Sequence, residues 1–579
     1  MIEKLFSSQV TFSLLSALFK QPNRPLPTTE LVATTGKNQA NIQRELDKLS
    51  SWGLVIKTKK ANQNSYSLNT HYQSFNALKD LFAGYHQKSK KYILLNEENG
   101  VCVLSVDYVL KAYASDYGVK KGIIDKAWDC LAVYKNDYGR FYFDQATVEY
   151  GEKRSLKKLL KDPSFVFEII YPESLTAGEE AQRIFKKLYR DNFHVTKPEA
   201  IKLFDKFLEI ITIQVGLNTI AVFDLKDQLY SNYLKKYLTE KTKKNTLSLN
   251  YAMEKLLAPE KLTYTQLLRL ELLKLAVKYH SRPKDATNDL KILQSKWGWL
   301  NYGYVGPGLD LAYFTQVFKE LSAKTTGELN KEIAELNDNE ARVKTAKKEI
   351  YQQLKIDVRH QKFIDALNLL SYLKVNRKDT MFLALYCIYE IFAQLLPDYR
   401  QKDLFNLTIA ESKDLLLGRL KAPAKELAAR SNYCAYIYSE NKFFYGAEVD
   451  KLLKAKVVAE EAGLESNNQL KLLDGTAACL GKTGNWVYGE VRIINSAADM
   501  SKMKEGDILV SVATTPDILA AMKKAAAIVT DHGGITCHAA IVSRELNIPC
   551  LIATKYATRV FKDGDKVIVC PRHGYIKFQ

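Results

Sequence analysis

One histidine near the C-terminus lies in a sequence pattern that could carry out phosphoryl chemistry. Residues 527–530 form a short apolar run typical of a strand, Asp-His-Gly-Gly follows, and a helical pattern begins at about His538. A strand, a loop and a helix start together place free backbone N–H groups and the positive end of a helix dipole where a phosphate can bind. Gly533 and Gly534 let the backbone approach such an anion closely.

A histidine at this position is chemically suited to accept a phosphoryl group. Its neutral imidazole has a nucleophilic lone pair near pH 7 and can form a covalent phosphoramidate, which divides a transfer into two steps. His538 is therefore our candidate catalytic residue. Taken alone, the glycine loop is equally compatible with a structural histidine.

A much longer run surrounds this loop. Residues 506–576, from GDILVSV to RHGYI, are similar, nearly residue for residue, to the swivelling phosphohistidine domain of PEP-utilising enzymes such as phosphoenolpyruvate synthase, pyruvate phosphate dikinase and rifampicin phosphotransferase. The resemblance implies that His538 carries the phosphoryl group and that Gly533, Gly534 and Thr536 shape its phosphate loop. Thr536 also takes the position of a regulatory phosphorylation site in some relatives, and a helix cap explains it equally well.

Other residues of this run also match relatives, and we predict no catalytic role for them. Thr514, Thr515 and Pro516 match a turn that lies near the histidine in relatives, or form an ordinary turn. A loop hydrogen bond would explain Asp531, and an ion pair on the helix surface would explain Arg544.

The resemblance also raises the question of where the phosphoryl group comes from. Relatives that complete a reaction alone join this domain to an ATP-grasp domain, and many add a PEP- and pyruvate-binding barrel. Here the sequence ends at Gln579, and no P-loop or other glycine-rich phosphate loop precedes the domain. We therefore expect a phosphotransferase component without a recognisable ATP-grasp domain or barrel.

The donor implied by the resemblance is ATP or PEP, with Mg²⁺ at the loading site. No metal ligands are identifiable in the sequence. A nucleotide- or PEP-binding partner protein, or an unrecognised site in the middle region, would supply the phosphoryl group. A hinge near residues 470–485 would let the domain move between two distant sites.

The N-terminal residues 1–84 predict a winged-helix domain. An apolar-periodic helix through Leu14 and Leu18, a helix over residues 28–35 and a third helix from about Asn38 precede a hairpin over residues 54–69. The run TTELVATTGKNQANIQRELDKLSSWGLV resembles winged-helix repressor-type domains.

A winged helix would place its third helix in a DNA groove and its hairpin on phosphates. The candidate DNA-binding residues are Gln39, Asn41, Gln43, Arg44 and Lys48 on the helix and Lys57, Lys59 and Lys60 on the hairpin. Glu45 and Asp47 cancel the positive charge of that helix, so protein contacts remain an equal alternative. The corresponding alternative function is a DNA-binding regulator gated by phosphorylation of the C-terminal domain.

Composition fits a multi-domain α/β protein. The 579 residues are 46% hydrophobic and 26% charged, with a net charge of +19 that is spread along the chain. Eight cysteines form no CxxC pair, and the most apolar stretch, residues 381–396, is too short to span a bilayer. We expect a cytoplasmic protein with reduced thiols that does not bind membranes.

Four domains are predicted. They are a winged helix at 1–84, a mixed α/β region of unknown fold at 85–250, a helical connector-like domain at 251–470, and the swivelling β/β/α phosphohistidine domain at 471–579. Strand patterns at 91–95 and 140–143 support the mixed region. Trp297, Trp299, Tyr302 and Tyr304 line a ligand pocket or pack a loop between helices.

Overall fold

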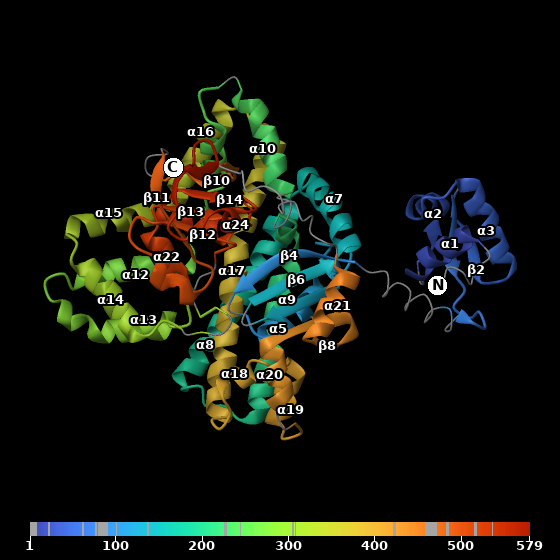
Figure 1. Ribbon diagram of the computed structural model, residues 1–579, viewed down its shortest axis with the longest axis horizontal. Coiled ribbons are helices and arrows are strands. Elements are labelled where there is room, and N and C mark those ends of the chain that lie inside the picture. Colours follow the sequence, from blue (N-terminus) through green and yellow to red (C-terminus); the bar gives the residue numbers. More distant parts are fainter. Residues whose placement is uncertain are drawn as a thin grey trace. The chain divides into compact units, whose positions relative to one another are not determined.

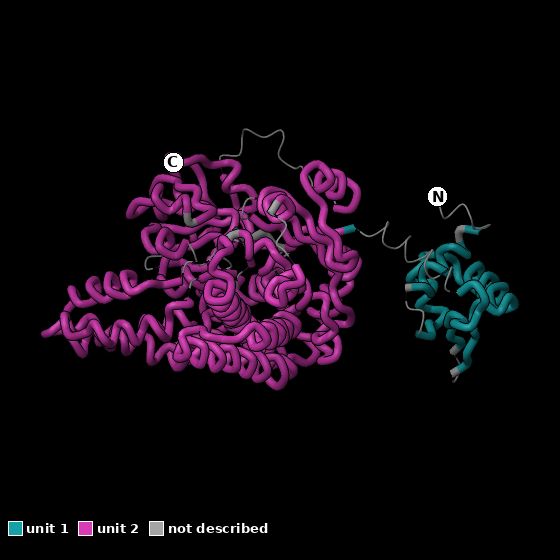
Figure 2. Tube along the Cα trace, turned by 90° about the horizontal axis from the view of Figure 1, so that it is seen from below, with its two compact units in different colours: residues 1–91 teal, residues 92–579 magenta. Residues whose placement is uncertain are grey.

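The computed structural model divides the chain into two compact units, Met1–Lys91 and Tyr92–Gln579 (Figure 2). The structure describes residues 8–20, 24–60, 63–75, 78, 91–99, 101–135, 138–224, 229–243, 245–300, 302–303, 306, 308–420, 424–457, 472–481, 486–514, 518–534 and 537–579. The chain is a multi-domain α/β protein. The unit boundary lies close to the predicted boundary at 84, whereas the predicted boundaries inside the second unit stay predictions.

The first unit packs three helices against a small sheet. The helices are α1 (Gln9–Lys20), α2 (Thr28–Thr35) and α3 (Gln39–Ser51), and the strands β1 (Leu26–Pro27), β2 (Val55–Lys60) and β3 (Gln63–Leu68) lie in the order β1-β3-β2. Leu14, Leu31 and Leu46 are fully buried at the centre. Asn38 caps α3 by accepting a hydrogen bond from the Ala40 N–H at 2.8 Å. The helices and the hairpin occur where the sequence predicts them.

An antiparallel five-stranded sheet in the second unit joins segments that are far apart in sequence. Its strands are β4 (Tyr92–Asn99), β5 (Cys130–Lys135), β6 (Tyr138–Asp144), β7 (Tyr433–Ile437) and β8 (Lys442–Tyr445), in the order β4-β6-β5-β7-β8. Leu131 of β5 pairs with Ile437 of β7. Residues 433–445 therefore correct the prediction that 251–470 is helical, because these aromatic-rich strands extend the sheet of the preceding region.

Helices build the rest of this region (Figure 1). They are α5 (Val103–Ala114), α6 (Tyr117–Lys120), α7 (Gln145–Lys161), α8 (Tyr171–Arg190), α9 (Lys197–Asn218), α10 (Leu229–Thr242), α11 (Leu249–Leu256), α12 (Tyr264–Lys278), α13 (Thr287–Trp297), α14 (Leu311–Ser322), α15 (Thr326–Asn337), α16 (Asn339–Gln353), α17 (Val358–Leu395), α18 (Gln401–Leu404), α19 (Ile409–Leu416), α20 (Ala424–Asn432) and α21 (Ala447–Lys456), with the short η3 (Thr219–Asp224) after α9. The predicted middle region is thus mostly helical.

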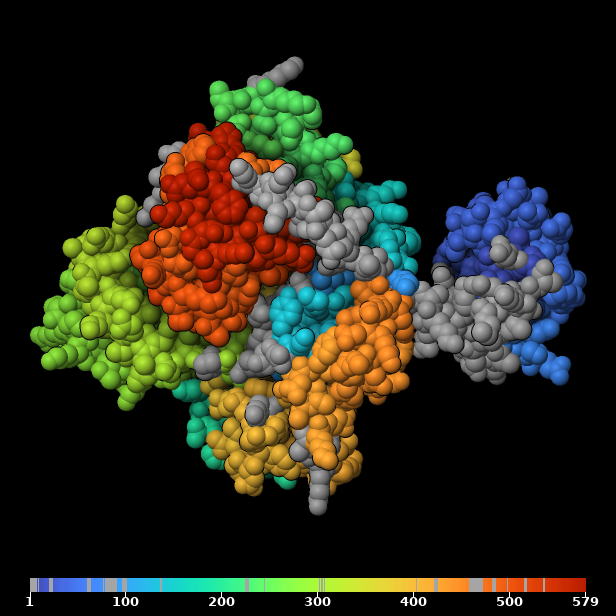
Figure 3. Space-filling view, viewed as in Figure 1, coloured from blue at the N-terminus to red at the C-terminus, as the bar shows by residue number. Residues whose placement is uncertain are grey.

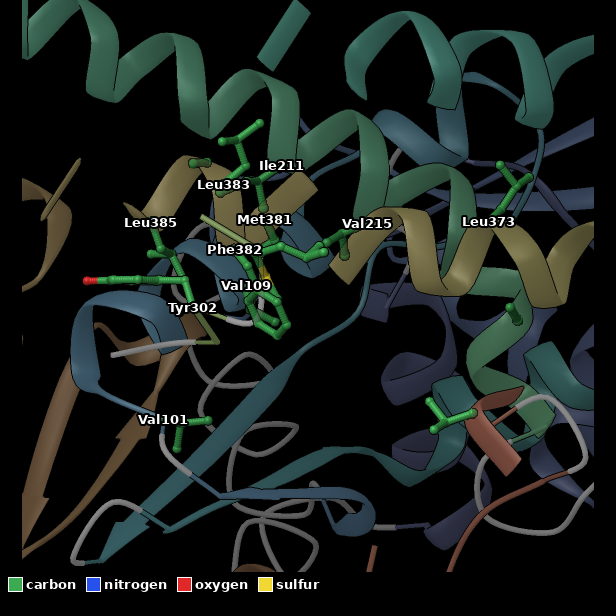
Figure 4. Close-up of a cluster of buried hydrophobic side chains, with 14 of the residues drawn as sticks. Val101, Val109, Ile211, Val215, Tyr302, Leu373, Met381, Phe382, Leu383 and Leu385 are labelled. Carbon is green, nitrogen blue, oxygen red and sulfur yellow. The ribbon is translucent and has the colours of Figure 1, made fainter. Parts of the chain in front are cut away.

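The 38-residue helix α17 runs through the core of this region. Figure 4 shows side chains of α17, among them Met381 and Phe382, in one buried cluster with Val109 of α5 and Ile211 of α9. Trp297, Trp299 and Tyr302 are buried too, and the Tyr302 ring meets Tyr386 of α17 edge to face at 5.3 Å. These aromatic residues pack the interior, and Trp297 and Trp299 also line a cavity of about 190 Å³. Tyr304 lies outside the described residues.

One helical stretch of the described chain, Lys197–Phe223, is long and apolar enough to cross a membrane by length and composition. Within the fold, 72% of its most apolar window is buried. Residues 381–396, the most apolar stretch of the sequence, do not meet the same criterion, because polar side chains interrupt them.

The C-terminal residues form an eight-stranded mixed sheet. Its strands are β9 (Leu472–Asp474), β10 (Thr476–Cys479), β11 (Val487–Ile493), β12 (Ile508–Ser511), β13 (Ala527–Thr530), β14 (Cys550–Ile552), β15 (Lys566–Cys570) and β16 (Tyr575–Phe578), in the order β10-β14-β13-β12-β11-β15-β16-β9. Strands β11 to β14 run parallel to one another. Along β12, Ile508 and Val510 contribute to one core, whereas Leu509 contributes to the core shared with the helices.

This sheet corrects the predicted position of the hinge. Strand β9 pairs with β16, and β10 pairs with β14, so residues 472–479 are fixed parts of the C-terminal domain. They cannot serve as the flexible part of a hinge at 470–485. Residues 470–471 and 482–485 lie outside the described residues. In Figure 3 the domain, coloured orange to red, occupies one face of the second unit beside the yellow-green helices.

Candidate functional site

The candidate histidine begins a helix directly after a tight glycine loop. Strand β13 ends at Thr530, and α23 (His538–Leu546) starts at His538, so the predicted strand, loop and helix are confirmed. Gly533 has φ +124, and a Cβ added there would lie 2.7 Å from Cys537 Sγ. Glycine is required at this position both by backbone conformation and by space. Thr536 lies outside the described residues.

Hydrogen bonds fix the start of the loop. The buried Asp531 carboxylate accepts hydrogen bonds from the Thr558 N–H at 3.1 Å and from the Thr558 hydroxyl. The Cys537 N–H donates to the Gly534 carbonyl at 2.8 Å, which closes the loop onto the helix. These bonds tie Asp531 to Thr558 and Gly534 to the first turn of α23.

One side chain orients the imidazole itself. Thr514 Oγ1 lies 2.8 Å from His538 Nδ1, and Thr514 is almost fully buried. In the tautomer whose Nδ1–H donates to Thr514 Oγ1, the free lone pair is on Nε2, which is then the nitrogen able to attack phosphorus. The sequence predicts that Thr514 belongs to a turn, with no catalytic role. The bond to Nδ1 gives it a positioning role instead.

The environment keeps His538 neutral. Burial lowers the pKa of this imidazole to about 3, and the positive charge of Lys378 on α17 acts in the same direction. Burial raises the pKa of the neighbouring Cys537 thiol. The positive charge of Lys374, one turn earlier on α17, partly opposes this by lowering that pKa. At neutral pH the imidazole therefore keeps its lone pair. Two cationic side chains of α17, Lys374 and Lys378, lie near the start of α23.

A pair of carboxyl groups faces across the same contact. Burial raises the pKa of Asp379 on α17 to about 8, and the nearby Glu545 carboxylate of α23 adds to that shift. Burial also raises the pKa of Glu545 to about 7, and Glu545 Oε1 accepts a hydrogen bond from Thr263 Oγ1 at 2.9 Å. Both groups hold a proton more tightly in this position than they would in water.

Polar contacts with α11 hold the C-terminal domain in place as well. Asn250 Nδ2 donates to the Arg572 carbonyl at 2.6 Å, and the Leu480 N–H donates to Glu254 Oε2 at 2.8 Å. The structure thus records the domain docked on α11, α12 and α17, with the histidine helix at the contact. The sequence carried no signal for this arrangement, because α17 lies about 160 residues before His538.

Arg544 differs from its predicted surroundings. The sequence predicts an ion pair on the helix surface for Arg544. In the structure its guanidinium is enclosed, and Nε donates to the Ala478 carbonyl of β10 at 2.9 Å. Burial lowers the pKa of this group. Arg544 therefore ties α23 to the edge of the sheet.

The candidate DNA-binding residues of the first unit divide into two groups. Gln39, Asn41 and Arg44 on α3 and Lys57 and Lys59 on β2 are exposed. Gln43 Nε2 donates to Asp47 Oδ1 and to the Tyr66 hydroxyl, both at 2.9 Å, and Lys48 lies 4.9 Å from the centre of the Trp52 ring. Those two side chains are engaged within the unit. Lys57 is engaged as well, since its Nζ lies 4.0 Å from Asp47 Oδ1 and 5.8 Å from the centre of the Tyr66 ring. The side chain of Lys60 is outside the described part.

Metal-binding residues do not gather anywhere in the described part of the chain. No group of three or more His, Cys, Asp or Glu side chains there could hold a metal ion. The described residues therefore offer no three-ligand site for a metal ion.

Comparisons with known proteins place the site in a family. Residues 503–574 match the mobile domain of PEP-utilising enzymes. Over 128 residues the chain is 48% identical to a probable phosphoenolpyruvate synthase of Archaeoglobus fulgidus, an alignment covering 22% of this chain and 16% of that protein.

Two further relatives give the same result. Identity is 47% over 117 residues with the phosphoenolpyruvate synthase of Pyrococcus furiosus, covering 20% of this chain and 14% of that enzyme. It is 40% over 129 residues with that of Neisseria meningitidis, covering 21% and 16%. The chain thus spans about a sixth of the length of these relatives. The resemblance seen in the sequence is confirmed for this part, because residues 503–574 match the family model of the PEP-utilising enzyme mobile domain.

Proposed function

We propose that the protein is a phosphotransfer component in which His538 receives a phosphoryl group and passes it to an acceptor. The observation that carries this proposal is the geometry of one imidazole. It is neutral, it begins α23 after the Gly533 loop, and its Nδ1 is held by Thr514 while Nε2 faces away from that bond. The donor is ATP or PEP, bound by a partner protein or by another region of this chain.

The transfer consists of two displacements. The Nε2 lone pair attacks the donor phosphorus, a P–N bond forms, and the electrons of the broken P–O bond leave with the donor oxygen. In the second displacement an acceptor oxygen attacks the same phosphorus, and the P–N electrons return to Nε2. Thr514 keeps the imidazole in one orientation through both steps.

The docked position supports a role for α17 in holding the phosphorylated form. A phosphoryl group on Nε2 would bring a dianion to a site where Lys374 and Lys378 already provide positive charge. Coulomb attraction is strong where solvent is partly excluded. We infer that phosphorylation tightens the docking of the C-terminal domain and that donor and acceptor are reached when the domain moves away.

The test is phosphoryl incorporation into full-length protein from ATP labelled at the β- or γ-phosphoryl group, or from labelled PEP, with and without cell extract. We expect acid-labile label in the wild type and none in His538→Ala. His532→Ala and His573→Ala are matched controls, since both histidines are exposed in the same domain. Label that requires extract identifies a partner as the donor site.

Absence of acid-labile label under every condition would overturn the proposal. Label that survives in His538→Ala but disappears in one of the control variants would move the acceptor to another histidine. The two results differ, so the chemistry and its residue are tested separately.

A second proposal concerns the first unit. We propose that it is a winged-helix domain that binds duplex DNA through the exposed Gln39, Asn41 and Arg44 of α3 and the exposed lysines of β2. Anisotropy of a labelled duplex would show binding that weakens steeply with salt, and Arg44→Ala would lower the salt slope by about one. Arg24→Ala, which removes an exposed ion pair with Glu30, is the control. Binding without salt dependence would contradict the proposal.

A further inference from the structure

A cavity of about 580 Å³ lies in the second unit, lined by residues outside the C-terminal domain. Its walls come from the loop before β5, from α7, and from Phe223 of η3. Its size is typical of sites for small organic ligands.

The floor of the cavity is buried and aromatic. Trp128 and Phe223 are 3% and 2% exposed, with ring centres 5.3 Å apart, and the buried hydroxyl-bearing residues Thr147 and Ser155 lie beside them. Gly151 makes this floor possible, because a Cβ there would lie 2.3 Å from Phe223 Cζ. A helix interior disfavours glycine by about 1 kcal/mol, so its presence in α7 is explained by the close approach of the ring.

The rim of the cavity is strongly cationic. Lys126, Arg154, Lys157, Lys158 and Lys161 line it, against one acidic residue of the described lining, Asp125. Asp125 already pairs with Arg154 at 3.0 Å. The lining therefore carries four positive charges in excess, which favours an anion.

Contacts at the rim show how these cations are held. Arg154 Nη1 donates to the Tyr150 hydroxyl at 2.7 Å, and Lys158 Nζ donates to the Gly122 carbonyl. Burial lowers the pKa of Lys158, and the positive charge of Arg154 acts in the same direction. Lys157 and Lys161 are exposed and form no ion pair with another described residue, so their ammonium groups can contact an incoming anion.

A lysine-rich helix face alone is a solvated surface, but this one borders a concave aromatic floor. We propose that the cavity binds a small phosphorylated ligand with a flat ring, a nucleoside phosphate, with its ring against Trp128 and Phe223 and its phosphates against the lysines of α7. This binding site is independent of the proposed role of His538.

Isothermal titration of the full-length protein with ATP, adenosine and tripolyphosphate, without added metal, tests the proposal. We expect ATP to bind most tightly, and both fragments to bind at least about tenfold more weakly, because each makes half of the contacts. Lys157→Gln with Lys161→Gln should weaken ATP and tripolyphosphate about tenfold and flatten the salt dependence, while adenosine is unaffected. Lys153→Gln, an exposed lysine of the same helix outside the cavity, is the matched control.

Each outcome decides one part of the proposal. Failure of ATP and tripolyphosphate to bind the wild type, or equal affinity in the double variant, would overturn it. Equal affinity for ATP and tripolyphosphate would remove the ring from the assignment. His538→Ala should bind ATP as the wild type does, so failure of the phosphotransfer proposal would leave this result unchanged.

Discussion

The His538 loop and the cationic cavity are two anion sites built in opposite ways. Gly533, Gly534 and His538 lie within six residues of one another, and the positive φ of Gly533 is a local backbone requirement. The cavity is assembled from a loop at 122–128, a helix at 145–161 and a residue at 223. A local site leaves a motif in the sequence, whereas an assembled site leaves separate lysines and aromatic residues without a pattern.

The largest effect should come from breaking the local site without touching the cavity. Gly533→Ala forces a side chain into a left-handed backbone and against Cys537 Sγ, so the loop must shift. A displacement of about 1 Å can cost roughly 100-fold in rate, and we expect labelling of His538 to fall by that order. ATP binding at the cavity should not change.

Gly506→Ala is the matched control for this prediction. Gly506 has φ +88, but nothing lies within 4 Å of an added Cβ. It should lose about 1–2 kcal/mol of stability and keep its labelling rate. Equal loss of labelling in both variants would show that strain anywhere in the domain, rather than the shape of the loop, controls the reaction.

Gly151→Ala breaks the cavity and spares the loop. Helix propensity alone predicts a gain of up to about 1 kcal/mol, but the collision with Phe223 should reverse the sign and cost about 1–3 kcal/mol. Thermal unfolding measures the change, and ATP affinity should fall with it. Gly327→Ala in α15, where an added Cβ is 4.0 Å from Thr325, should be neutral or stabilising. A stabilised Gly151→Ala would show that Phe223 moves aside freely.

Thr514→Val sharpens the comparison by removing one hydrogen bond from the local site. A hydrogen bond of this kind contributes about 0.5–1.5 kcal/mol, so labelling should slow about three- to tenfold without disappearing. Thr514→Ser should restore most of the rate, because it keeps the hydroxyl that contacts Nδ1. Unchanged labelling in the valine variant would remove Thr514 from the site.

The smallest effect concerns the contact with α17, a part of the histidine site that is distant in sequence. Exposed carboxyls lose their protons near pH 4, whereas Asp379 and Glu545 hold theirs to about pH 8 and 7 when docked. Docking therefore takes up protons and strengthens as pH falls from 8. Below about 6.5 a released His538 gains a proton that the docked imidazole does not take up until about pH 3. Docking then takes up about one proton instead of two, so it strengthens less steeply but continues to strengthen until the released carboxyls gain their protons near pH 4.

Hydrogen-exchange protection of α23, corrected for intrinsic rates, should thus rise as pH falls from 8 towards about 4, most steeply between pH 8 and 6.5. Glu545→Gln should flatten this rise, whereas Glu505→Gln, at an exposed site of the same domain, should not. Protection that rises steadily up to pH 9 would contradict the assignment of the carboxyl pair.

The sequence predicted the local parts of the structure and missed the assembled ones. The strand, loop and helix around His538 were predictable because propensity and glycine geometry act over a few residues. Three other features depend on tertiary packing. They are the pairing of β5 with β7, the proximity of Glu545 to Asp379, and the close approach of Phe223 to Gly151 at the cavity. Strands β9 and β10, within the predicted hinge at 470–485, were missed because strands of three and four residues show no clear alternating pattern.

The five-stranded sheet has a consequence for synthesis of the chain. Strand β5 lies between β6 and β7, and its partner β7 emerges from the ribosome about 300 residues later. At 5–20 residues per second this interval is roughly 15–60 s. During it the apolar run Cys130–Tyr134 presents an unpaired strand edge, a surface that promotes aggregation. Nascent chains stalled before residue 433 should therefore need chaperone protection that the finished protein does not.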